Sequence, residues 1–392
     1  MMNRLQRPGA HRLLRRGGAL ALVCAIAACA APEGEGTVEL DALASAGPSA
    51  LCQEARRLEA VARQENFTLD FAQAEQHLRT VAQIRGMEGV QPVCGGPVAT
   101  ADAWSELALS LSSQGKFRLA DGAFSEARGA LGEAPAPVTE AEVGAIQLAG
   151  ARIYAYEAMH EVNRRDYAVT PELSADALAL LTGGGGLAVD LGDDQLFRAD
   201  RAEQDRVLLE VVSLHASAAA NARQGDFSLA LAEIDRASQS AAALKGGSDA
   251  VRSRIQVEQA ALQVAAGQPE AGLLTATTAS EVFARELADT PLLARALLTQ
   301  GIAQQELGRR TAAYDLFQQA IDVYTENPAE LGYERLWPFI RVVLDLRRQG
   351  ALSDDQAARD VFRAAQVMRS ATAASDIAAS AAQFEAGSGS AA

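Results

Sequence analysis

The sequence predicts an all-α fold, an α-solenoid in which antiparallel helix pairs pack side by side. Three observations lead to this prediction. The chain is rich in alanine, only 5% of it is aromatic, and no run of alternating β-branched residues stands out. Small residues recur at the same spacing in four separate stretches. In each stretch a glycine falls at the expected turn between two helices, where a left-handed backbone costs least.

Residues 101–131 show this hairpin pattern most clearly. Two helices are expected on either side of a turn at Gly115. Small residues lie where the helices would touch, and large apolar residues fill the grooves beside them, because small side chains let two backbones approach closely. The predicted packing positions are Trp104, Ala108, Gly115, Ala120, Phe124 and Ala127.

The same gaps of seven, five and seven positions between small residues return in three later stretches. Ile234 and Phe317 take the large apolar place that Phe124 has in the first stretch, whereas Ala276 departs from it. The three later sets are Ala218, Gly225, Ala230 and Ala237; Ala260, Gly267, Gly272 and Ala279; and Gly301, Gly308, Ala313 and Ala320.

This layout resembles the tetratricopeptide repeat family, whose helical hairpins carry small and large residues at these positions. The resemblance covers the four stretches and is closest over residues 101–131. It implies a right-handed superhelix whose inner groove holds a protein or peptide. The starts at Ala218, Ala260 and Gly301 lie 42 and 41 residues apart. Because the usual period is about 34 residues, longer helices or links than the family norm are expected.

Residues 1–28 have the pattern of an export signal. Arginines precede an apolar run, residues 19–28, that is too short to span a bilayer. The run ends in Ile26-Ala27-Ala28-Cys29, which resembles the signal of bacterial lipoproteins. The resemblance implies cleavage before Cys29, lipid on its thiol, and a membrane anchor at the periplasmic face, with Ala30 favouring the outer membrane. The alternative is an ordinary secretory signal with a coincidental cysteine.

Residues 29–48 are small, acidic and interrupted by glycine and proline, so a flexible tether is expected there. The full chain has a net charge of −15, from 35 basic and 50 acidic residues. Five of the basic residues and no acidic residue lie in the leader, so the cleaved chain carries about −20. A chain this acidic is not expected to bind nucleic acid, because binding to the phosphate backbone depends on basic side chains.

The chain has four cysteines, and two remain once the leader is removed and Cys29 carries lipid. In an oxidising compartment, Cys52 and Cys94 are then a natural disulfide pair. Closing a loop of that length would constrain the unfolded chain by about 4 kcal/mol in the entropy model. Two separate buried thiols are the alternative.

The helical-repeat array is expected over residues 49–349. Its first hairpin has predicted helices over residues 49–64 and 68–85, with a break near Asn66, and a loop over residues 86–97 follows. Further expected boundaries are a capping box at Thr139 and Glu142 for a helix ending near Asn163, a helix start at Thr170-Pro171, a glycine-rich stop over residues 182–186, a restart near Asp200, and a break at Trp337-Pro338.

A C-terminal connector helix is expected over residues 350–386. Ser353 and Gln356 form a capping signature for it, and apolar residues follow at helical spacing as far as about Phe384. Residues 387–392 are expected to be a disordered tail.

The segment from Phe362 to Gly387 resembles the helix that joins the helical-repeat half to the peptidase half in bacterial CHAT-domain proteins. In that family a caspase-like domain with a catalytic histidine and cysteine follows, and here none does. The resemblance therefore covers the repeats and the connector and carries over no catalytic residue. It implies a separately encoded CHAT peptidase as one partner to consider.

No constellation of residues in the sequence points to catalysis, a metal or a cofactor. His77, His160 and His215 are isolated, without a second ligand at metal spacing. Acidic pairs such as Asp193-Asp194 and Asp354-Asp355 lie at helix starts, where they suit the helix dipole. The expected function is a lipid-anchored, non-enzymatic scaffold for protein–protein interaction. The alternatives are the remnant of a CHAT-domain cysteine peptidase and a lipoprotein of envelope assembly.

Overall fold

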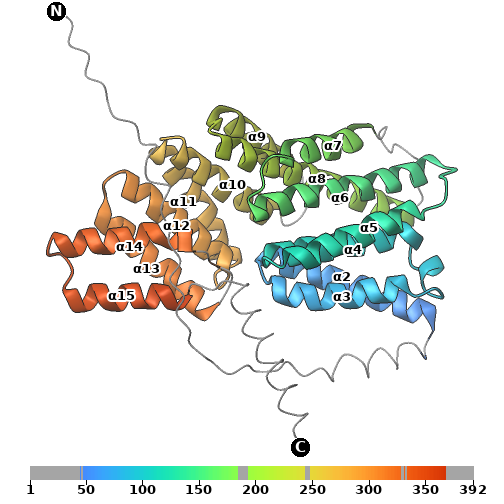
Figure 1. The fold of residues 1–392 in the computed structure, drawn as a ribbon, viewed down its shortest axis with the longest axis horizontal. Helices are drawn as coiled ribbons and strands as arrows, with labels where there is room; N and C mark the ends of the chain where they lie inside the picture. Colours follow the sequence, from blue (N-terminus) through green and yellow to red (C-terminus); the bar gives the residue numbers. More distant parts are fainter. Residues whose placement is uncertain are drawn as a thin grey trace, which may run out of the picture. The chain divides into compact units, whose positions relative to one another are not determined.

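The computed structural model describes residues 45, 47–183, 193–242, 248–327, 331 and 333–367. Across these ranges the chain forms fourteen α-helices, one short 3-10 helix and no strand, which confirms the predicted all-α class (Figure 1). The helices are α2 (Pro48–Thr68), α3 (Phe71–Gly86), η1 (Gln91–Val93), α4 (Gly96–Ser113), α5 (Phe117–Gly132), α6 (Glu140–Arg164), α7 (Thr170–Gly183), α8 (Asp193–Gln224), α9 (Phe227–Ala241), α10 (Ser248–Ala265), α11 (Pro269–Glu286), α12 (Pro291–Glu306), α13 (Arg310–Glu326), α14 (Tyr333–Arg348) and α15 (Asp354–Val367).

Consecutive helices pack as hairpins, from α2 with α3 to α12 with α13, and α14 packs against α15. Several first helices of neighbouring hairpins also touch each other: α4 contacts α6, α6 contacts α8, α10 contacts α12, and α12 contacts α14. Each hairpin therefore buries its apolar faces against its neighbours in the chain, which is the packing of a helical-repeat protein.

The small residues at the predicted contact positions are buried. Ala108 on α4 and Ala120 on α5 share one apolar cluster with Phe124, and Trp104 packs against its edge. Ala127, one helical turn further, is fully buried. The other two sets with a large apolar residue behave alike: Ala218, Ala230, Ile234 and Ala237 form one cluster, and Ala313, Phe317 and Ala320 belong to another.

The glycines at the hairpin turns have the backbone that was expected of them. Gly115, Gly225, Gly267 and Gly308 have φ between 73° and 90°, the left-handed region that glycine adopts without strain. They join α4 to α5, α8 to α9, α10 to α11 and α12 to α13.

Two other glycines allow close helix contact. A Cβ on Gly301 of α12 would lie 2.7 Å from Cε1 of Phe317 on α13. A Cβ on Gly272 of α11 would lie 2.8 Å from the backbone oxygen of Ala260 on α10. In the hairpin of α10 and α11, Ala276 stands where the other sets have a large apolar residue. The large buried residue of α11 is instead Phe283, seven positions further along, in a cluster with Ala279 and Leu292.

A disulfide joins Cys52 on α2 to Cys94 after η1, with a Cα–Cα distance of 5.3 Å. The break in this first hairpin differs from the prediction. Asn66 lies inside α2, and the turn falls at Leu69 and Asp70. Leu69 adopts φ 70°, and the Asp70 side chain accepts a hydrogen bond from the Gln73 backbone N–H, which caps α3.

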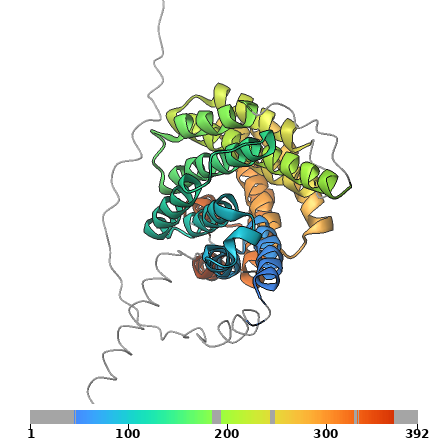
Figure 2. The same cartoon turned by 90° about the vertical axis from the view of Figure 1, so that its right-hand side faces the viewer.

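The turn of the first hairpin also touches helices far along the chain. Phe67 and Leu69 pack against an apolar cluster that contains Phe283 and Leu292, on α11 and α12. In Figure 2 the blue start of the array lies beside orange helices from much later in the chain. The Arg254 guanidinium on α10 donates to the backbone oxygen of Phe67 at 3.3 Å. The start of the array is therefore linked to its fifth and sixth hairpins.

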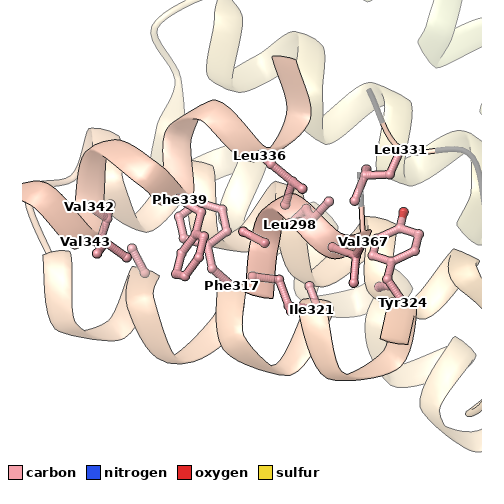
Figure 3. Close-up of a cluster of buried hydrophobic side chains, with 14 of the residues drawn as sticks. Leu298, Phe317, Ile321, Tyr324, Leu331, Leu336, Phe339, Val342, Val343 and Val367 are labelled. Carbon is pink, nitrogen blue, oxygen red and sulfur yellow. The ribbon is translucent and has the colours of Figure 1, made fainter. Parts of the chain in front are cut away.

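The last described hairpin corrects one prediction. The break expected at Trp337-Pro338 is absent, because Pro338 lies inside α14. Leu336 and Phe339 of the same helix are fully buried, so packing holds α14 together around the proline. α14 ends at Arg348, and α15 begins at Asp354 and packs on α13 and α14. Figure 3 shows Val367 of α15 in one cluster with Phe317 and Phe339.

The leader of residues 1–28, Cys29, most of the tether of residues 29–48, and residues 184–186 of the glycine run lie outside the described residues. The same holds for the connector beyond Val367 and for the tail of residues 387–392. In the part of the chain that is described, no helix combines the length and apolar character that a membrane span requires.

Candidate functional site

A cavity of about 390 Å³ lies among the first helices of the first five hairpins. One face each of α2, α4, α6, α8 and α10 lines it, together with the start of α3. On α6 these residues are Arg152, Tyr156 and Met159, which lie four and three positions apart and therefore share one helix face. The walls are mainly apolar, with Phe67 and Leu109 among the side chains that form them. We call this space the inner cavity.

A cluster of buried charges borders the inner cavity. Arg63 on α2 pairs with Glu59 at 3.1 Å, with Glu106 of α4 at 3.3 Å, and with Asp205 of α8 at 3.7 Å. Arg152 on α6 pairs with Asp205 at 2.8 Å and also contacts Asp102 of α4. These side chains, which we call the charge cluster, connect four successive first helices.

The charge cluster and its burial shift the pKa values of its members. Burial opposes the charge on Arg152, but the carboxylates of Asp102 and Asp205 outweigh it and raise the pKa of Arg152 well above its usual value. Burial raises the pKa of Glu106, against the pull of Arg63. The Tyr156 hydroxyl donates to Glu106 at 3.2 Å, and burial raises the pKa of Tyr156 as well. The tyrosine therefore stays neutral and serves as a hydrogen-bond donor.

A second set of charges lies on α8, α10 and α12. The Glu258 carboxylate pairs with Arg295 at 2.5 Å and with His215 at 3.9 Å. Burial works against this carboxylate, but Arg295 and His215 hold the pKa of Glu258 down at about 2. Arg254, which lines the inner cavity, has different electrostatic surroundings. Burial and the nearby Arg295 lower the pKa of Arg254 to about 10, because Glu258 compensates them only in part.

One polar side chain at the cavity lacks a partner. Asn66 is only 9% exposed, and neither its amide nitrogen nor its amide oxygen makes a hydrogen bond among the described residues. A buried amide that makes no hydrogen bond costs about 1–3 kcal/mol, so a native structure rarely keeps one without a reason.

A second cavity, of about 430 Å³, lies among α5, α6 and α7 and is lined largely by carboxylates. Its main polar groups have partners within the fold. Asp121 accepts hydrogen bonds from His160 at 3.0 Å and from Arg164 at 3.3 Å, and Glu157 pairs with Arg128. The inner cavity, with its unpaired amide, is therefore the stronger candidate for binding.

The three histidines that the sequence left isolated each have a carboxylate neighbour. His77 lies 2.8 Å from Glu65, and His215 lies near Glu258. His160 is buried between Ser112 and Asp121, and burial lowers its pKa. No group of three metal-ligating side chains is found in the part of the chain that the structure describes.

Sequence reasoning missed the inner cavity and the charge cluster. A signal was present, since Glu59 with Arg63 and Asp102 with Glu106 lie four apart on helices rich in alanine, leucine and serine. Such spacing places both charges on one helix face, but it does not show whether that face is buried. Arg152 and Asp205 lie more than 40 residues further along the chain, so only the fold brings them in.

The described residues offer fixed cations, one unpaired amide and apolar walls, which suit binding. Comparisons with known proteins add little to this picture. No protein-family model and no curated protein matches the chain. The crystal structure of BtubC (BKLC) from P. vanneervenii is similar, with a TM-score of 0.43 and 14% sequence identity, over 69% of this chain and 91% of BtubC. Neither a family nor a function follows from a likeness at this level.

Proposed function

We propose that this protein is a lipid-anchored, non-enzymatic scaffold of the bacterial envelope that holds a protein or peptide on the inner faces of its first helices. One observation carries the proposal. Five successive first helices each turn a face toward one cavity, and the buried charge cluster ties four of them together. A repeat array builds such a continuous surface because each hairpin adds one helix to it.

The lipoprotein signal at Cys29 supports the anchoring part of the proposal. A Cys29→Ser change removes the thiol that would carry the lipid. We expect labelled palmitate to enter the wild-type chain and not this variant, and the variant to leave the membrane fraction. Equal labelling of the two chains would remove the anchor from the proposal and leave the binding surface untouched.

Site-specific photocrosslinking in intact cells tests the binding surface. Leu208 on α8 lines the inner cavity and is 40% exposed, whereas Leu119 on α5 is 53% exposed and does not line it. A photoreactive residue at Leu208 is expected to give a discrete adduct of protein or peptide mass, and the same residue at Leu119 is not. Identical adduct patterns from both positions, or none from Leu208, would contradict the proposal.

The first partner to test is a separately encoded CHAT-type peptidase, which the resemblance of Phe362 to Gly387 suggests. Purified scaffold and peptidase would be mixed and examined by size-exclusion chromatography. Co-elution, lost when a bulky residue is placed at Leu208, supports this partner. Separate elution removes the CHAT link and leaves the search for other envelope proteins to the crosslinking experiment.

A further inference from the structure

The polar end of the inner cavity lies where α2 meets α10. Asn66 and Phe67 are neighbours at the end of α2, and both line the cavity. Arg254 of α10 donates to the Phe67 backbone oxygen, and its guanidinium carbon lies 5.9 Å from the centre of the Phe67 ring. The unpaired amide of Asn66 and the guanidinium of Arg254, which binds the next residue Phe67, therefore lie at the same end of the cavity.

Arg254 differs from the other two arginines that line the cavity. Arg63 and Arg152 each contact at least two carboxylates of the charge cluster. Arg254 makes no ion pair within 4.0 Å in the described part of the chain, because Arg295 and His215 occupy Glu258. A guanidinium held against an aromatic ring, with much of its charge uncompensated, attracts an anion, and a carboxylate fits its planar donors best.

Asn66 adds the second contact. Its amide N–H groups can donate to a carboxylate oxygen that the guanidinium also binds, and its amide oxygen remains available to a donor on the ligand. The two carboxylates that line the cavity, Glu106 and Asp205, are both bound to Arg63 and face Arg152. An incoming anion therefore meets carboxylates whose charge is already compensated.

The volume limits the size of the ligand. A cavity of about 390 Å³ lies at the lower end of the roughly 300–1,000 Å³ range of small-molecule pockets. It therefore suits a small ligand, and a molecule of about a dozen non-hydrogen atoms is a reasonable size for a probe. Because its remaining walls include Phe67, Leu109 and Met159, most of those atoms should be apolar.

We propose that the inner cavity binds a small carboxylic acid with an apolar body, whose carboxylate is held by Arg254 and Asn66. This goes beyond the scaffold function, which needs only the surface around the cavity and not a ligand inside it. A bound acid would also supply a partner to the Asn66 amide, which the fold itself leaves unpaired.

Decanoate, with twelve non-hydrogen atoms, is the probe. The full chain carrying Cys29→Ser, which removes competing acyl chains, would be titrated with decanoate and with decylammonium by calorimetry. Decanoate is expected to bind, and decylammonium to bind at least about tenfold more weakly, because it brings a cation to Arg254. Arg254→Gln and Asn66→Leu should each weaken decanoate binding, the former by about ten- to a hundredfold, the range for a hydrogen bond to a charged group.

A matched control is present in the same fold. Arg223 of α8 stacks over the Tyr167 ring at 5.6 Å, much as Arg254 stacks over Phe67, but Arg223 does not line the inner cavity. Arg223→Gln should leave decanoate binding unchanged. Arg254→Lys, which keeps the charge, should recover part of the affinity and so separates loss of binding from loss of folding.

Three results would overturn the proposal. Decylammonium could bind as well as decanoate, or Arg254→Gln and Arg223→Gln could have equal effects. In the third, decanoate would not bind at all; binding of acetyl-Leu-Leu in its place would assign the site to the end of a peptide chain. These titrations do not measure crosslinking at Leu208, so the scaffold function is tested independently of them.

Discussion

The two ends of the array differ in the side chains that join the inner faces of their helices. From α2 to α8, the inner faces are joined by the charge cluster around Arg63 and Arg152. From α12 to α15, the core is apolar, and Phe317, Phe339 and Leu336 are fully buried in it (Figure 3). The ion pairs of this second region are more exposed and lie at its surface, as between Arg310 and Asp345.

The difference is instructive because the two kinds of contact do not stabilise a fold equally. Burying a large apolar side chain contributes about 1.5–3 kcal/mol. A buried ion pair gains little over a well-packed apolar one, since the desolvation of both charges offsets their attraction. From α2 to α8, an apolar cluster with Leu107, Leu111 and Phe124 already provides such packing. What the charge cluster adds is a polar border to the inner cavity, which suits a binding surface.

The largest expected effect tests the charge cluster. Arg152→Met leaves the carboxylates of Asp102, Glu106 and Asp205 without their central cation, which should lower the free energy of unfolding by about 3–5 kcal/mol. Denaturant unfolding followed by circular dichroism would measure it. As a control, Arg128→Met on α5 removes a more exposed pair with Glu157 and should cost less than about 1 kcal/mol. Similar losses in the two variants would mean that the charge cluster is not buried as described.

The next effect tests close packing in the apolar region. Gly301→Ala places a Cβ 2.7 Å from Cε1 of the buried Phe317 ring and should cost about 1–3 kcal/mol. Adding Phe317→Leu should relieve the clash, so that the double variant loses less than the sum of the single changes, as a double-mutant cycle would show.

The matched glycine in the other region should behave differently. A Cβ on Gly150 of α6 would lie 3.2 Å from Cδ1 of Leu180, the end of a flexible side chain that can move. Alanine is also favoured over glycine inside a helix by about 0.5–1 kcal/mol. Gly150→Ala is therefore expected to be neutral or slightly stabilising, and a loss as large as that of Gly301→Ala would contradict the packing described for α12 and α13.

The smallest effect is a dependence on pH. Burial lowers the pKa of His160 and of His215 below their ordinary value of 6.5, so the unfolded chain takes up these protons first as the pH falls. The stability that the neutral rings contribute is present above pH ~6.5 and is lost as the pH falls through that value toward the folded-state pKa values. Unfolding measured between pH 8 and 5 should show the decline, and a His160→Gln, His215→Gln double variant should flatten it. A wild-type stability that rises on acidification in this range would argue against buried neutral histidines.

Local features of the fold could be predicted from the sequence, because they depend on residues close together in the chain. The turn glycines, such as Gly115 and Gly225, adopt the expected positive φ. The capping box of Thr139 and Glu142 forms as predicted. The rule for proline failed: Pro338 lies inside α14, a helix that Leu336 and Phe339 anchor by full burial.

The sequence by itself determined the helical class and the hairpin turns, since backbone preferences and the spacing of small residues act within one or two helical turns. Only the tertiary structure decided that α15 packs on α13 and α14 and that Arg63, Arg152 and Asp205 meet. Only the fold also placed Arg254 beside Phe67, across 187 positions of sequence. The physical reason is that burial and charge pairing depend on which helices become neighbours, and a helical pattern shows that a face exists without showing what lies against it.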